Sequence, residues 1–102
     1  MAIQQGSPAL LRFQCREYDE AGKDVGPLNL SDPEFNPLRA VLTSPTGRRI
    51  EVNPDVVDAA GGVAEWQAPE GTLDELGPWQ SQVLAGDWKA RPRSFYVYGP
   101  NL

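Results

Sequence analysis

Residues 9–18 read Ala-Leu-Leu-Arg-Phe-Gln-Cys-Arg-Glu-Tyr, and no other segment of the chain is as regular. Leu11, Phe13 and Cys15 occupy every second position, and polar residues stand between them. Successive side chains of a β-strand point to opposite faces, so this period of two places the three apolar side chains on one face. The segment therefore predicts a strand with one buried face.

Similar alternation recurs along the chain, and turn-forming residues separate the repeats. The clearest turn is residues 44–47, where Pro45 suits the first central position and Gly47 tolerates a positive φ. Ten Gly and ten Pro also favour many turns over long helices. The other expected strands cover residues 25–30, 38–43, 48–52, 63–67, 79–85 and 93–98. About seven short strands predict an all-β domain, an Ig-like antiparallel β-sandwich.

Three connecting segments interrupt this pattern. Residues 31–37 hold two prolines and are expected to form a crossing loop. Short helical turns are expected after Asn53-Pro54, because Pro suits the start of a helix, and over residues 72–76, where Gly77 would end the turn. No linker or repeat divides the chain, so residues 1–102 are expected to form one domain with an N-terminal arm over residues 1–8.

Charge and composition exclude several classes of partner. The net charge is −5 and the pI about 4.5, and an acidic surface repels phosphate, so nucleic acid is not an expected partner. The local basic sequences, Arg48-Arg49 and Lys89 with Arg91 and Arg93, are interpreted as solvated charges. No apolar run reaches the ~18 residues of a membrane span, and the N-terminus lacks a signal peptide. Synthesis and folding in a cytoplasm are expected.

The residues that usually carry catalysis or bind metals are scarce. The chain has no His, which removes the commonest general base and the commonest transition-metal ligand. Its one Cys, Cys15, falls on the apolar face of a strand and is expected to be buried. The carboxylates of residues 19–24 and of Asp74-Glu75 stand in turns, without the spacing of a calcium loop. We therefore expect no catalytic residue, no metal site and no cofactor.

The three tryptophans allow two interpretations. Trp66 and Trp79 are in phase with apolar residues, which favours the core for both. Trp88 stands between Asp87 and Lys89 and is expected to be the most exposed of the three, in contact with a partner or stacked on a sugar ring.

The order of these motifs resembles the Ig-like β-sandwich domains of phage virions, found in tail-tip collars, fibre-attachment points and upper baseplate proteins. Those domains combine a Gln-Gly phrase, an alternating strand, an Asp/Gly hairpin, a Leu-x-Leu phrase, a Pro-x-Gly turn, a Gly-x-Ala-x-Trp or Tyr strand, a Leu-Asp-x-x-Gly-x-Trp corner and a final aromatic strand. The counterparts here are Gln5-Gly6, residues 11–18, residues 19–24, Leu28-Asn29-Leu30, residues 45–47, residues 62–66, residues 73–79 and residues 95–97.

Two departures from that pattern bear on the expected role. Residues 32–37 replace a Thr-Gly-Ala phrase, and the chain ends directly after the sandwich, where many such proteins carry a receptor-binding extension. The resemblance therefore implies a non-enzymatic adaptor, collar or fibre-attachment subunit, made in the host cytoplasm and located in the virion. Its partners would be other virion proteins and copies of itself in a symmetric assembly. The alternatives are a capsid decoration protein and a carbohydrate-binding module that uses an exposed Trp.

Two surfaces are the candidates for partner contact. One is the N-terminal arm, where Ile3 has no obvious core partner and the backbone could pair with a neighbour's sheet edge. The other is a loop end expected to gather aromatic side chains. The candidate partner-binding residues are Ile3, Phe35, Trp88, Tyr98 and Leu102.

Overall fold

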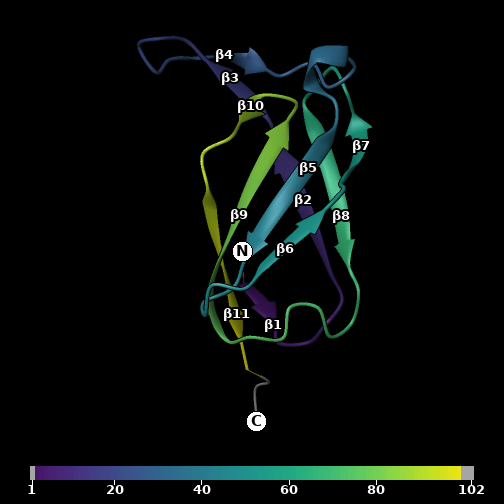
Figure 1. Ribbon diagram of the computed structural model, residues 1–102, viewed down its shortest axis with the longest axis vertical. Helices are drawn as coiled ribbons and strands as arrows, with labels where there is room; N and C mark the ends of the chain where they lie inside the picture. Colours follow the sequence, from purple (N-terminus) through teal and green to yellow (C-terminus); the bar gives the residue numbers. More distant parts are fainter. Residues whose placement is uncertain (1, 100–102) are drawn as a thin grey trace.

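The computed structural model, described here for residues 2–99, has a β-sandwich-like all-β fold (Figure 1). The larger sheet has the order β1-β11-β9-β5-β6, with β10 paired to β9. Its strands are β1 (Ala2–Gln4), β5 (Leu38–Thr43), β6 (Arg49–Val52), β9 (Gly77–Ala85), β10 (Trp88–Lys89) and β11 (Arg93–Tyr98). The smaller sheet has the order β2-β8-β7, from β2 (Ala9–Gln14), β7 (Asp55–Asp58) and β8 (Val63–Ala68).

A third element is a two-stranded ribbon that projects from one end of the sandwich (Figure 1). It joins β3 (Arg16–Tyr18) to β4 (Asp24–Pro27). Arg16 Nε donates to Asp24 Oδ2 over 2.6 Å across this ribbon, and the Asp19 carboxylate accepts from the backbone N–H of Ala21 and of Lys23. These side-chain contacts close the turn that the sequence predicted.

The core lies between the two main sheets and follows the predicted alternation. In β2, Leu11 and Phe13 are buried while Arg12 and Gln14 are exposed. In β11 the same alternation buries Phe95 and Val97. Because every second side chain of each strand points inward, the two inner faces meet as one apolar cluster.

Trp79 is the largest side chain that is fully buried. Its ring stacks on Phe95, with the ring centroids 6.1 Å apart, and its register partner on β11 is the same Phe95. Burial of Trp79 was predicted from its phase with Val83, and this prediction is confirmed. Trp66 is half-buried and packs against the edge of the core, so its predicted burial is only partial.

Both predicted helical turns are wrong. Asn53-Pro54 leads directly into β7, which pairs with β8, and residues 72–76 form bends without a helix. The helical turn of the described residues is η1 (Pro33–Phe35), inside the segment expected to be a loop. Asp32 caps it by accepting from the backbone N–H of Glu34 over 3.1 Å. A Pro after a polar residue starts a helix or a strand equally well, and pairing with β8 decided the outcome at Asn53-Pro54.

The N-terminal arm is also not free. β1 pairs in parallel with β11, which sets Ile3 beside Val97, and the side chain of Ile3 is only 6% exposed. The expectation that Ile3 lacks a core partner was wrong. Its partner is more than ninety positions away in the sequence, so no local pattern could reveal the pairing.

Residues 2–99 contain no helix that is long and apolar enough to cross a membrane.

Candidate functional site

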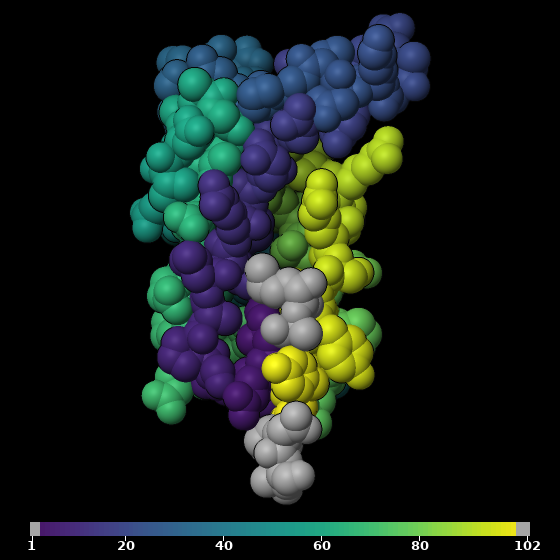
Figure 2. Space-filling view, turned by 180° about the vertical axis from the view of Figure 1, so that it is seen from behind, coloured from purple at the N-terminus to yellow at the C-terminus, as the bar shows by residue number. Residues whose placement is uncertain are grey.

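A groove runs along one side of the sandwich, where the two main sheets end next to each other. Figure 2 shows the surface hollowed between β2, in purple, and β11, in yellow. Its volume is about 270 Å³. We call it the seam groove, and it is lined by residues 11–14, Ser81, Val83, Ala90, Arg91 and residues 93–95.

The groove is open because neither sheet is covered there. β2 is the last strand of the smaller sheet. On the larger sheet, β1 pairs with residues 96–98 of β11, and no other strand of residues 2–99 pairs with residues 93–95 on that side. Two strand edges with unpaired backbone groups therefore lie on opposite sides of one hollow, and such edges are where proteins add a further strand.

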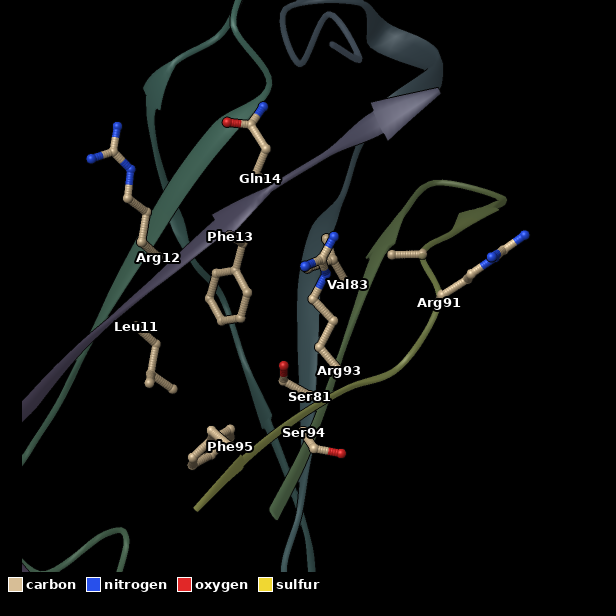
Figure 3. Close-up of a pocket in the computed structure, with 11 residues that line it drawn as sticks. Leu11, Arg12, Phe13, Gln14, Ser81, Val83, Arg91, Arg93, Ser94 and Phe95 are labelled. Carbon is tan, nitrogen blue, oxygen red and sulfur yellow. The ribbon is translucent and has the colours of Figure 1, made fainter. Parts of the chain in front are cut away.

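The inside of the seam groove is apolar. Leu11 and Phe13 from β2 and Phe95 from β11 point toward one another across it, with Ser81 and Val83 of β9 behind them (Figure 3). Leu11, Phe13, Val83 and Phe95 are each less than a tenth exposed. The groove thus ends on the hydrophobic core itself, and a ligand in it would contact apolar side chains that are already held in place.

The rim of the groove is basic. The Arg93 guanidinium lies over the opening, while Arg12 and Arg91 extend away from it on either side (Figure 3). A second hollow of about 230 Å³ continues from the groove toward the β3–β4 ribbon, and there Arg91 lies 5.8 Å from the ring centroid of Tyr18. Five of the nine Lys and Arg residues of the chain line the two hollows: Arg12, Arg16, Lys89, Arg91 and Arg93. No Asp or Glu of the described residues lines either hollow.

This basic rim contrasts with the chain as a whole, whose net charge is −5. Arg16 is neutralised by Asp24, and its pKa is raised chiefly by that hydrogen bond. Arg12 and Arg93 have no ion pair with any carboxylate of residues 2–99. Their charges are therefore free to attract an anionic group at the groove.

The sequence missed this site for a definable reason. The concentration of Lys89, Arg91 and Arg93 was visible, but it was interpreted as solvated surface charge. What the sequence does not show is that residues 89–93 return along the sandwich opposite β2. The charges of residues 89–93 come to lie beside β2 only through the tertiary fold, so the local sequence could not indicate it.

Phe35 and Trp88 are brought together as predicted, at the end of the sandwich that carries η1 and β10. Both line a shallow hollow there, and both are half-buried against the core. Gly86, with φ +59°, lets the β9–β10 turn approach η1, and any side chain at Gly86 would collide with the carbonyl oxygen of Glu34. Trp88 is thus less exposed than the sequence suggested.

Tyr98 lies at the other end of the sandwich, so the expected single cluster of aromatic side chains is wrong. β11 runs from the end that carries β10 to the opposite end, where Tyr98 pairs with Gln4 and is 42% exposed (Figure 1). Ile3, on the same strand pair, is buried and cannot serve as an exposed anchor. Leu102 lies outside the described residues.

The surroundings of Cys15, Asp74 and Glu75 shift their pKa values from the ordinary ones. The pKa of Asp74 is lowered by a hydrogen bond from Arg48, and the pKa of Glu75 is lowered chiefly by a hydrogen bond from Thr46. Burial raises the pKa of the Cys15 thiol to about 11. Over residues 2–99 no group of three His, Cys, Asp or Glu side chains could hold a metal ion. What the arrangement can do is bind through shape, backbone edges and charge.

No protein-family model matches the chain, and a search of curated proteins found no matching sequence.

Proposed function

We propose that the chain is a non-enzymatic structural protein of a phage particle, an adaptor, collar or fibre-attachment subunit at the tail or baseplate that acts through protein–protein contacts. The observation that carries the protein-binding part is the seam groove, where two uncovered strand edges flank an apolar floor. The resemblance of the motif order to Ig-like virion domains supports the phage part.

The tryptophan positions favour this proposal over a sugar-binding module. A sugar platform needs an aromatic ring exposed on one whole face. Trp79 is fully buried, and Trp66 and Trp88 are half-buried against the core. Because Trp79 is fully buried, a platform that exposes all three rings is absent from the described residues.

Particle fractionation tests the proposal. An antibody raised against the purified chain is used to probe density-gradient fractions from a lysed culture of the host. We expect the chain to sediment with intact particles and to stay with them through a high-salt wash. Its detection only in the soluble lysate, with a known tail protein present in the particle band as the control, would rule out the virion role.

A further inference from the structure

We infer that the seam groove binds an extended acidic segment of another protein, which adds to the smaller sheet as a strand beside β2. This inference deepens the proposed function. It rests on that function in one respect, that the partner is a protein. Four features carry it: the hydrogen-bonding pattern of β2, the regularity of its free edge, the apolar floor and the basic rim.

The first feature is the hydrogen-bonding pattern of β2. Alternate residues of an antiparallel strand bond to the same neighbour, and the Cys15 N–H donates to the Gly62 carbonyl over 2.7 Å. Phe13 and Leu11 lie two and four residues before Cys15 in the same register, so their backbone groups also face β8. The backbone N–H and C=O groups of Leu10, Arg12 and Gln14 therefore point to the open side and can pair with an added strand.

The second feature is that β2 is a receptive edge whereas the opposite edge of the same sheet is not. β7 pairs with β8 through an irregular register between Val56 and Asp58, and it carries a carboxylate at each end. Bulges and charges of this kind protect an edge against pairing. β2 pairs with β8 over six consecutive residues without a shift, so its free side is regular along its whole length.

The third feature is the match between a strand and the groove. An added strand beside β2 would direct every second side chain toward Leu11, Phe13 and Phe95. The groove has a volume of about 270 Å³ and lies along the edge of β2. Its floor can therefore receive a row of apolar side chains from one added strand.

Charge selects the kind of segment. Arg12, Arg91 and Arg93 flank the groove and no carboxylate of residues 2–99 lines it, so acidic side chains between the apolar ones would lie beside positive groups. The phosphates of a nucleic acid would also meet these groups and could accept from the open N–H groups of β2, but they cannot donate to its open carbonyl oxygens. An acidic, alternating peptide segment satisfies the backbone, the floor and the rim together.

A synthetic peptide tests the inference directly. The probe is a fluorescently labelled peptide of about eight residues, a usual strand length, in which Val alternates with Asp or Glu. We expect saturable binding to the purified chain that weakens as salt is added. A counterpart with Lys at the acidic positions should bind at least about tenfold more weakly, since its charges repel the rim. Equal binding of the two peptides, or no binding of the acidic one, would overturn the inference.

Matched charge reversals locate the site. Arg93→Glu should weaken binding of the acidic peptide about tenfold, because an attraction becomes a repulsion. Arg49→Glu is the control: Arg49 is also an exposed arginine at the first position of a strand, but it lies on β6 at the far edge of the larger sheet. Equal losses in the two variants would contradict binding at the seam groove.

Amide hydrogen exchange tests the added strand itself. In the free chain the amides of Leu10, Arg12 and Gln14 should exchange faster than those of Leu11 and Phe13, which bond to β8. The acidic peptide should slow exchange at the amides of Leu10, Arg12 and Gln14 and leave the other two unchanged. Binding without that protection would overturn strand addition.

Two further outcomes are distinguished. Self-association of the chain that Arg93→Glu abolishes without peptide would identify a second copy as the occupant and overturn the choice of another protein. Absence of the chain from washed particles would defeat the virion role alone, because the peptide measurements use only the purified chain.

Discussion

The indole Nε1 of Trp79 donates a 2.9 Å hydrogen bond to the backbone carbonyl of Glu75, four residues earlier in the chain. The Glu75 carboxylate in turn accepts from Thr46 Oγ1 over 2.5 Å and lies 3.4 Å from Arg48 Nε. One corner therefore joins the start of β9 to the turn between β5 and β6. The polar atom of the largest core side chain is satisfied by backbone at the point where the chain enters the sandwich.

Trp79→Phe tests this corner. The phenyl ring keeps most of the apolar contact but leaves the Glu75 carbonyl without its donor, and an unsatisfied buried polar group costs about 1–3 kcal/mol. We expect a loss of unfolding free energy in that range or somewhat above it, measured by urea denaturation. Trp66→Phe is the control, because Trp66 is half-buried and its indole has no hydrogen bond within the described residues. Equal losses for the two variants would show that the Trp79 hydrogen bond contributes nothing.

Ile3→Ala tests the role of the N-terminal strand. Because Ile3 is buried beside Val97, the change should lower the unfolding free energy by about 2–4 kcal/mol. Gln4→Ala, at the exposed neighbouring position, should change it by less than about 0.5 kcal/mol. Deletion of residues 1–8 should destabilise the fold at least as strongly as Ile3→Ala. A melting temperature unchanged by Ile3→Ala would mean that β1 is not packed in solution.

Cys15 gives a test that depends on pH. Burial raises the pKa of its thiol from 9.0 to about 11, so between these values the unfolded chain loses the proton while the folded chain keeps it. Since the unfolded state then binds fewer protons, stability should fall as the pH rises through this window. A thiol reagent should react slowly with the native chain and rapidly in denaturant.

The control for this prediction is Cys15→Ala, whose stability should fall less steeply with pH over the same window. A native thiol that reacts as fast as the denatured one would contradict the burial of Cys15.

Asp74→Asn tests the ion pair with Arg48. The hydrogen bond from Arg48 Nη2, 2.5 Å from Asp74 Oδ1, lowers the pKa of Asp74 below its ordinary value of 3.8. A carboxylate with a depressed pKa in the folded state stabilises the fold above its unfolded value, and this stabilisation is lost as the pH falls below 3.8. The variant should therefore lose less stability than the parent when the denaturation midpoint is compared at neutral pH and below pH 3.8.

Asp87→Asn is the comparison for the ion pair, because Asp87 is exposed and has no ion pair among residues 2–99. If Asp74→Asn and Asp87→Asn respond to acid alike, the Arg48–Asp74 contact does not form in solution. Both groups are solvent-exposed, so the difference between the variants should be small.

Strands with a clear period of two were the most predictable part of the fold. β5, β9 and β11 lie where the alternation placed them, because every second residue of each strand faces the core. The single strand predicted over residues 9–18 is wrong in its extent: it breaks at Cys15 into β2 and β3, which belong to different sheets. The short strands β1, β7 and β10 carry too few residues for a pattern and were not predicted. Their existence depends on neighbours that satisfy their backbone groups.

The candidate site was less predictable than the fold. Phe35 and Trp88 do meet in one hollow, but Ile3 is buried and Tyr98 lies at the far end of the sandwich. The seam groove was not foreseen, because it depends on which strand edges are left uncovered. That is a property of the order of strands in each sheet and of no single segment.

The sequence by itself determined an all-β chain with Leu11, Phe13, Trp79 and Phe95 facing inward, because the alternation of side chains along a strand is a local property. Only the tertiary structure decided that β1 covers the last three residues of β11 and leaves the first three open beside β2. The physical reason is that backbone groups pair with whichever strand is nearest in space. Residues about eighty positions apart therefore form the two sides of the groove.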